Sequence, residues 1–248
     1  ADPRIMPSLR ALSNHPKAAR MVDPNEVGCA ACVACLYRDK IFVANAGDCR
    51  AVLCRGGTAI DMSEDHKPEQ ASEFARITDA GGCVLSHRVG ERIVHRVNGD
   101  LSLSRSLGDL RYKRNTMLPP EAQMITAAPD VRTFQRQADD EFMALACDGV
   151  WDVLSSQQVV DFIRPSLPDL LAGSLKPSHL AEALLDHCLS PDPLKTCGIG
   201  GDNMTMVIVV FTGSMKPRTL APEIPKPEEL PNLLGGCAPY PRKRTVWI

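Results

Sequence analysis

The 248 residues include 28 Lys+Arg and 30 Asp+Glu, which leaves a net charge of −2. This near balance argues against a chain that binds nucleic acid through bulk charge. No apolar run is long enough to span a membrane and no signal-peptide pattern opens the chain, so we expect no membrane partner. The ten cysteines lie mostly within apolar segments. They indicate a reducing compartment, cytoplasmic or nuclear, rather than a disulfide scaffold.

Residues 1–27 carry several prolines and no sustained period, and we interpret them as a leader with one short helix near Arg10 to Arg20. Three strand-like segments follow, Cys29 to Tyr37, Lys40 to Ala46 and Arg50 to Arg55. The breaks Gly47-Asp48 and Gly56-Gly57 follow the second and third segments. The pattern therefore predicts an antiparallel meander.

The first of these segments contains three cysteines with the spacing C-x2-C-x2-C, namely Cys29, Cys32 and Cys35. An iron–sulfur cluster would need a fourth thiolate, and no ferredoxin-like continuation follows. On a strand, Cys29 and Cys35 would face one side and Cys32 the other. We therefore favour small, buried hydrophobic residues over a cluster site.

The stretch Asp65-His66-Lys67-Pro68 is predicted to open a helix, because proline suits a first helical turn. The helix would bury a stripe of four apolar residues. These are Ala71, Phe74, Ala75 and Ile77. Gly81-Gly82 would end the helix. The Asp-His pair could bind a metal, but a capping or loop-fixing role is favoured.

The segment 111–128 is irregular, with basic residues at its start and Pro119-Pro120 in its middle, which predicts a surface flap. Further along, Ser155 and Gln158 form a capping-box pattern at the start of a helix. Another helix is predicted from about Ser178 to Leu189. Its His187 is interpreted as a residue at the edge of the core rather than a ligand.

Six apolar residues run without a polar break from Phe142 to Cys147, which predicts a strand buried on both faces. Asp148 and Gly149 follow, where the chain can turn sharply, and Asp152 comes one short turn later. A carboxylate at the mouth of a buried strand needs a positive partner, such as a hard cation. Taken alone, a turn or a helix cap explains this pattern equally well.

A second glycine-rich segment, Gly198 to Thr205, leads into the apolar run Met206 to Phe211 and contains Asp202. It is no phosphate-binding loop, because a strand rather than a helix follows it. If this strand is an antiparallel neighbour of the Phe142 strand, Asp148 and Asp202 meet. Two such carboxylates would repel each other unless a divalent cation lay between them. The residues therefore predict a metal site with oxygen ligands.

Six stretches of the chain resemble the metal-dependent protein serine/threonine phosphatases of type 2C, especially the gamma-like members. They are Ala44-Asn45-Ala46-Gly47-Asp48-Cys49-Arg50, Asp65-His66-Lys67-Pro68, Arg96-Val97-Asn98-Gly99, Ser104 to Asp109, Asp148-Gly149-Val150-Trp151-Asp152 and Gly201-Asp202-Asn203-Met204-Thr205. Their order and spacing match the family across residues 28–212. The resemblance implies an α+β fold, a four-layer α-β-β-α sandwich of two mostly antiparallel sheets, here incomplete at its N-terminal side.

The resemblance also implies a reaction, the hydrolysis of phosphoserine and phosphothreonine in proteins. Two Mn²⁺ or Mg²⁺ ions would activate a bridging water for attack on phosphorus. Carried over residue by residue, Asp148 and Asp202 match carboxylates of the binuclear site. Asp48 and Asp152 match a third, weaker metal position, and Asn203 supports a ligand from beside it. The expected partners are phosphoprotein substrates.

The family's Asp-Gly-His-Gly-Gly motif is missing, since the one Asp-Gly in this sequence is Asp148-Gly149. The resemblance therefore implies a truncated gene model, one half of an interrupted chain, or a degenerate paralogue. Two functions remain open at this point. The chain is either the C-terminal portion of an enzyme, with little activity alone, or a non-catalytic pseudophosphatase that binds partners.

Residues 213–248 are rich in proline, and we interpret them as a disordered tail. Pro222 and Pro225 have a P-x-x-P spacing, but a solvated linker is favoured over a recognition motif. Arg242-Lys243-Arg244 could serve as a nuclear localisation signal, although a solvated charged end of the chain is favoured.

Overall fold

The computed structural model of the chain describes Asn25 and residues 27–212. All of these residues belong to one compact unit, Ala1–Met215. The helix predicted near Arg10 to Arg20 and the predicted tail lie outside the described residues, as does almost all of the leader. No helix in the described part of the chain is long and apolar enough to cross a membrane.

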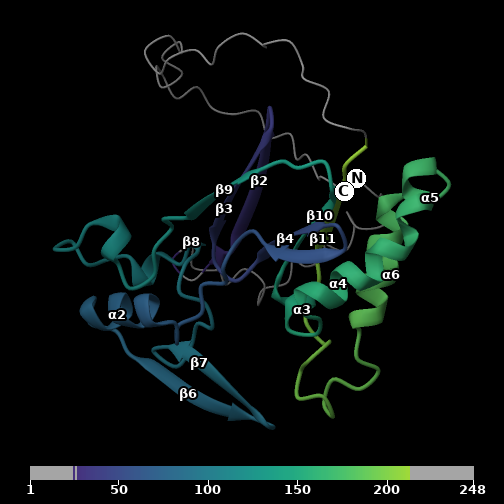
Figure 1. The fold of residues 1–248 in the computed structure, drawn as a ribbon. Helices are drawn as coiled ribbons and strands as arrows, with labels where there is room; N and C mark the ends of the chain where they lie inside the picture. Colours follow the sequence, from purple (N-terminus) through teal and green to yellow (C-terminus); the bar gives the residue numbers. More distant parts are fainter. Residues whose placement is uncertain (1–24, 26, 213–248) are drawn as a thin grey trace, which may run out of the picture. The chain divides into compact units, whose positions relative to one another are not determined.

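Two antiparallel sheets form the centre of the fold (Figure 1). The first has the order β11-β10-β4-β5, from strands Met206–Val210, Asp140–Ala146, Arg50–Arg55 and Thr58–Asp61. The second has the order β2-β3-β9, from strands Ala31–Tyr37, Lys40–Ala46 and Asp130–Gln135. The predicted meander is therefore half right. β2 and β3 do pair, but the chain then crosses to the other sheet at Gly47, so β4 pairs with β5 and β10.

Strand β10 is buried on both faces, as predicted. Phe142, Ala144 and Ala146 point toward the helices and belong to the larger core cluster. Met143 points to the other side, where it packs with Ile41 of β3 and other residues of both sheets. Because one cluster contains residues of β3, β4 and β10, the two sheets stack face to face around it.

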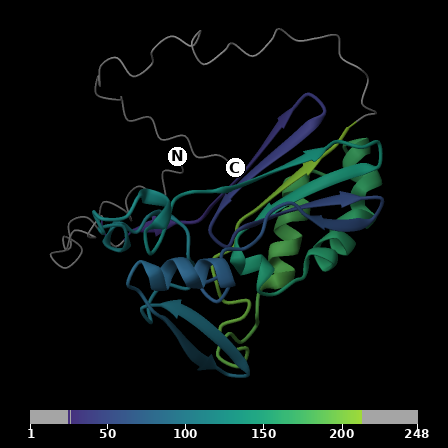
Figure 2. The same ribbon diagram turned by 60° about the vertical axis from the view of Figure 1, so that its left-hand side comes forward.

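The helices that cover the first sheet are α4 (Ser156–Ile163), α5 (Leu167–Ala172) and α6 (Pro177–Cys188). They gather on one side of it (Figure 2). The predicted capping box is present, because the Ser155 hydroxyl accepts from the Gln158 amide and the Gln158 side chain accepts from the Ser155 amide. His187 lies on the exposed side of α6, where its ring contacts Phe162 at 5.4 Å between centroids. It is an edge residue, as predicted.

The outward face of the second sheet is open to solvent among the residues described. Val33 of β2 is 60% exposed and Val131 of β9 is 61% exposed. Their strands flank Ala44 of β3, which pairs with both residues. The described residues thus supply the two sheets and one outer helical layer of the expected sandwich.

A separate substructure lies at one end of the sheets. It contains α2 (Ala71–Asp79), the hairpin of β6 (Val84–Val89) and β7 (Arg92–Val97), the short pair β1 (Gly28–Cys29) and β8 (Leu107–Gly108), and the 3-10 turns η2 (Leu110–Tyr112) and η3 (Pro120–Ala122). The predicted flap is irregular and exposed in its middle. Its ends are anchored, since Tyr112 and Ile125 are buried against α2 residue Ile77.

Two predictions about burial were wrong. Helix α2 begins at Ala71 rather than near Pro68, and it buries Glu73 and Ile77 while Phe74 is 46% exposed. The predicted stripe is right for Ile77, which is buried in a hydrophobic cluster, and wrong for Phe74. The other buried residue of the helix is Glu73, which is held by ion pairs. Cys32 and Cys35 of β2 face opposite sides, and Cys29 lies in β1. Cys29 and Cys35 are both exposed, so the favoured interpretation as buried residues is wrong for these two.

Candidate metal centre

The register of the first sheet brings the predicted aspartates to one end of it. Arg50 of β4 pairs with Ala146 of β10. Asp48 comes two residues before this pair and Asp148 two residues after it, so both carboxylates lie just beyond the same end of the sheet. On the other side of β10, Ala146 pairs with Met206, and the Cys147 amide donates to the Thr205 carbonyl at 3.2 Å. The predicted antiparallel neighbours are confirmed, and the segment that carries Asp202 leads into this end.

The carboxylates at this end influence one another electrostatically. Burial raises the pKa of the Asp148 carboxyl above its usual value, and the charges of Asp48, Asp202 and Asp152 raise it further, while Lys67 opposes them. Asp48 is 3% exposed. Asp152 and Asp202 lie in more exposed positions. All four predicted residues therefore act on one region, with Asp148 at its centre.

Lys67 is the cation that meets this cluster. Its ammonium lies 2.7 Å from a carboxylate oxygen of Asp48. Burial by itself would lower the pKa of Lys67, but Asp48, Asp152 and Asp148 together raise it. A buried carboxylate needs such a partner, because desolvation penalises its charged form. In the sequence, Lys67 was interpreted only as part of a helix start and of a family motif. Its ion pair with Asp48 was not predicted.

Gly149 has a different role from the one expected. It lies in the short helix α3 (Asp148–Trp151), and it has no unusual backbone angle. A side-chain carbon at this position would come within 2.5 Å of the Asn203 carbonyl oxygen. Glycine is therefore required for close approach between the segments that carry Asp148 and Asp202, not for a sharp turn. The Asn203 amide itself donates to Asp202 at 2.7 Å.

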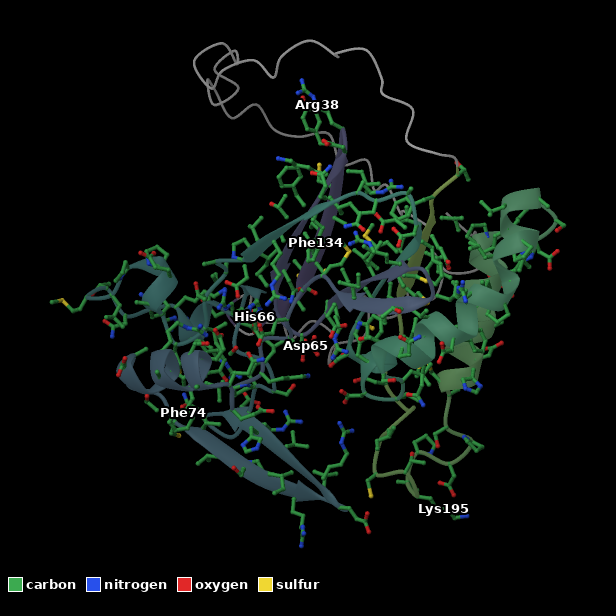
Figure 3. The ribbon with its side chains drawn as sticks, in the orientation of Figure 1. Arg38, Asp65, His66, Phe74, Phe134 and Lys195 are labelled. Carbon is green, nitrogen blue, oxygen red and sulfur yellow. The ribbon has the colours of Figure 1, made fainter. Side chains whose placement is uncertain are left out.

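The loop that carries Lys67 is fixed by its two preceding residues (Figure 3). The Gly47 amide donates to Nδ1 of His66 at 3.1 Å, so the ring's other nitrogen, Nε2, carries the proton that it shares with Asp130 at 3.1 Å. Asp65 receives two hydrogen bonds of 2.9 Å from Arg50. The favoured loop-fixing role of Asp65-His66 is confirmed.

A second network, which the sequence did not reveal, ties α2 to the same end. Glu73 is 1% exposed, accepts a 2.5 Å hydrogen bond from the Ser104 hydroxyl, and pairs with Arg105 and Arg76, each at 2.7 Å. Burial would raise the pKa of the Glu73 carboxyl, but these partners lower it overall. The Ser104-Arg105 stretch is part of a motif that the sequence analysis singled out. A single Glu within a helix gives no pattern from which its burial could be predicted.

Beside the carboxylates is a cavity of about 310 Å³. Its acidic side is formed by Asp148, Asp152 and Asp202, and its other side by β7 residues that include Arg92 and Arg96. The Arg92 guanidinium lies 3.5 Å from the Asp152 carboxylate, so these two lining residues form an ion pair. The cavity is large enough for a phosphorylated side chain, and both acidic and basic side chains line it.

Carboxylate oxygens suit hard divalent ions, and a set of converging aspartates matches Mn²⁺ or Mg²⁺ better than softer metals. Yet within residues 25 and 27–212, no three Asp, Glu, His or Cys side chains lie close enough together to hold an ion. The residues fit such an ion in donor chemistry and placement, as part of a site. Their role as ligands stays a prediction.

Comparison with known proteins identifies the relatives of this arrangement. A family model described as Protein phosphatase 2C matches residues 6–193. The chain belongs to the protein phosphatase 2C family. The match includes Asp48, Asp148 and Asp152, begins within the predicted leader, and ends before Asp202.

Named relatives of this protein phosphatase 2C chain are much longer than it is. It is 47% identical to Protein phosphatase 1G of Bos taurus over 206 residues, which are 82% of this chain and 35% of the relative. It is 47% identical to Probable protein phosphatase 2C 11 of Oryza sativa subsp. japonica over 184 residues, 74% of this chain and 47% of the relative. The chain thus spans about a third to a half of these relatives.

Solved structures confirm the expected fold class. A phosphatase from a pathogenic strain of Toxoplasma gondii is similar with a TM-score of 0.57 and 32% identity, covering 70% of this chain and 48% of that one. A serine-threonine phosphatase 2C from Toxoplasma gondii has a TM-score of 0.61 over 82% of this chain and 65% of that one, and its 22% identity supports the fold alone. The family resemblance and the α+β fold with antiparallel sheets are both confirmed.

Proposed function

We propose that this chain supplies part of the active site of a protein serine/threonine phosphatase that hydrolyses phosphoserine and phosphothreonine. The observation that carries the proposal is the convergence of Asp48, Asp148 and Asp202 at one end of the first sheet, beside a cavity of about 310 Å³. Family membership supports protein substrates. A cleft end lined by carboxylates supports metal-dependent hydrolysis.

In this proposal, Asp148 and Asp202 contribute ligands to a binuclear Mn²⁺ or Mg²⁺ site, and Asp48 and Asp152 belong to a third position. Bound metal ions supply a water of lowered pKa and neutralise charge on the transferring phosphoryl group. The chain's own residues hold the carboxylates in place. Lys67 neutralises Asp48, and the contact of Gly149 with Asn203 fixes the spacing of two ligand segments.

The same proposal assigns residues 1–27 to a leader, 28–212 to a partial phosphatase domain and 213–248 to a tail, in a cytoplasmic or nuclear protein. The alternative, a non-catalytic phosphoprotein-binding module, is favoured by one observation. The described residues contain no group of three ligand side chains ready for a metal. The retained aspartates favour the enzyme.

The metal assignment is tested by calorimetric titration of the full chain with Mn²⁺. We expect an affinity on the order of millimolar, because few carboxylates contribute. Asp148→Asn should weaken binding at least about tenfold. Asp79→Asn, an exposed aspartate at the end of α2, is the matched control and should bind as the native chain does. Native-like binding by Asp148→Asn would show that Asp148 is no ligand.

The activity assignment is tested with a phosphothreonine peptide and Mn²⁺ at neutral pH. The chain alone should show no turnover above the Asp148→Asn variant. Adding the portion of Protein phosphatase 1G that precedes its matched region should restore turnover. Strong activity of the chain alone would contradict a partial site. Peptide binding without turnover, even after this addition, would favour the binding module.

A further inference from the structure

The hairpin of β6 and β7 forms the wall of the cavity opposite the aspartates. Val84 and Val97 of this hairpin pair with each other and pack in the cluster that contains α2 residue Ile77. Neighbouring residues of a strand point to opposite faces, so Arg96, and Arg92 four residues before it, lie on the face away from α2. Both arginines line the cavity. The hairpin therefore presents a basic face to the carboxylate end of the first sheet.

The tip of the hairpin lies against the segment that leads to Asp202. Gly90 of the tip has a φ of +62°, and a side-chain carbon there would lie 2.6 Å from Sγ of Cys197. Figures 1 and 2 both show the tip next to this loop. The close approach places Arg92, two residues after Gly90, beside the aspartates rather than in open solvent.

Three cationic side chains line the cavity in the described part of the chain, and Arg92 has the weakest partner of the three. The Lys67 ammonium pairs with Asp48 at 2.7 Å, and Arg96 donates to a backbone carbonyl at 2.5 Å. Arg92 lies 3.5 Å from the Asp152 carboxylate, and these two side chains are 46% and 44% exposed. Exposed ion pairs of this kind stabilise little, so Arg92 can exchange Asp152 for another anion.

A phosphorylated side chain that enters the cavity would bring its neighbours in the peptide within reach of Arg92. Asp152 follows Asp148 by four residues at the end of helix α3, which is a rise of about 6 Å. The Arg92 guanidinium lies a further 3.5 Å from Asp152. An extended peptide advances about 3.3 Å per residue, so a side chain two or three residues from the phosphorylated one can meet Arg92.

We propose that Arg92 is a specificity-determining residue, which selects substrates with an acidic side chain two or three residues from the phosphorylated residue. This inference rests on the proposed function, because it takes the aspartate end of the cavity as the place of the phosphorylated side chain. Arginine binds a carboxylate through two parallel N–H donors, which adds geometric fit to the attraction of charge. Asp152, once it is neutralised by a cation, no longer competes for the guanidinium.

The subsite is tested by fluorescence anisotropy with the full chain, Mn²⁺ and labelled phosphothreonine peptides. One peptide carries Glu at the second and third positions on both sides of the phosphothreonine, and its counterpart carries Gln at the same positions. The native chain should bind the Glu peptide at least about fivefold more tightly, because Arg92 pairs with a carboxylate and not with an amide. Arg92→Gln should remove this preference, and Arg92→Glu should reverse it.

The matched control is Arg88→Gln, which should keep the preference. Arg88 is an exposed arginine of the same hairpin, but it pairs with Ile93 and so lies on the face opposite Arg92. Each protein is judged by the ratio of its affinities for the Glu and Gln peptides. This ratio cancels any effect of a substitution on Mn²⁺ binding or on the folded fraction.

Equal binding of the two peptides by the native chain overturns the subsite, as does a preference that survives Arg92→Gln. A third peptide, with Glu at these positions but with unphosphorylated threonine, separates this inference from the proposed function. If it binds as tightly as the phosphorylated Glu peptide, recognition of the phosphate fails, while the ratio for Glu and Gln peptides still decides whether Arg92 binds acidic side chains. If calorimetry detects Mn²⁺ binding but no peptide binds, the subsite is overturned and the metal assignment stands.

Discussion

The two sheets of this chain are built from similar strands but differ in what covers their faces. The sheet β11-β10-β4-β5 has helices on one face and the other sheet on the second, and Phe142 at its centre is fully buried. The sheet β2-β3-β9 shares the inner core, but its outward face is exposed at Val33 and Val131. The first sheet therefore carries the stability and the site, and the second is a surface that the described residues leave uncovered.

The largest expected difference between the sheets comes from the same truncation made in each. Phe142→Ala should lower the free energy of unfolding by about 3–5 kcal/mol, because it leaves a cavity within the larger core. Phe42→Ala is the matched control, since Phe42 of β3 is half-exposed and pairs with Cys35 and Thr133 on the outward face. It should cost about 1 kcal/mol. Urea denaturation measures both, and equal losses would contradict the comparison.

This difference explains how much of the fold could be predicted. Strands β10 and β11 are uninterrupted apolar runs, and burial on both faces produces such runs. Strand β9 has an exposed pattern with Phe134 as its inward hydrophobic residue, so no periodic signal marks it. The crossing from β3 to β4 at Gly47 was read as a hairpin, because a turn between sheets and a turn within one sheet use the same residues.

The candidate site, like the fold, could be predicted from the sequence only in part. The four aspartates stand out in the sequence because each follows or precedes a glycine-containing break or a buried strand. That Asp48 comes near Asp148 depends on the pairing of β4 with β10, whose register one sequence specifies only through packing. Lys67 pairs with Asp48, 19 positions away, and Glu73 bonds with Ser104 and Arg105, 31 and 32 positions away, so no local pattern encodes these contacts. Among the partners of Glu73, Arg76 alone lies at a helical spacing.

A smaller change in stability is expected from Asp148, at the end of the first sheet. The pKa of Asp148 is raised in the folded chain, so the folded state holds its proton to higher pH than the unfolded state does. The chain should therefore lose stability as the pH rises from 3.8, the usual pKa of an aspartate, through the raised pKa of the folded chain. Asp148→Asn removes this loss and should raise Tm in chelator at pH 7 by about 2–4 °C.

The control is Asp202→Asn, whose exposed carboxylate should change Tm less. Melts of the three proteins from pH 4 to pH 7 decide the point. The gap between native and Asp148→Asn should widen with rising pH. A gap that is constant with pH, or a variant that melts earlier, would mean that Asp148 stabilises the end of the strand by hydrogen bonding rather than straining it by charge.

The open face of the second sheet should affect association more than folding. Val131→Lys should change the free energy of unfolding by less than about 0.5 kcal/mol, because its side chain is already mostly exposed. It should reduce self-association and dye binding, since exposed apolar sheet faces favour both. Leu194→Lys is the control, at a residue 92% exposed and far along the chain from this sheet. Light scattering that falls equally for both variants would show that general charge, not this face, governs association.

The smallest expected effect is a difference in thiol reactivity between the two faces of β2. Chemical labelling of the native chain measures it. Cys32 of β2 faces the space between the sheets, where burial raises the pKa of its thiol to about 11. Cys35, three residues later, is exposed on the outward face. Because the thiolate is the reactive form, iodoacetamide at pH 8 should label Cys32 at least about tenfold more slowly than Cys35. Peptide mass spectrometry over a time course measures both rates in one native sample, and denaturant should make them converge. Equal rates in the native chain would mean that β2 is not held against the first sheet, and that both faces of the second sheet are open to solvent.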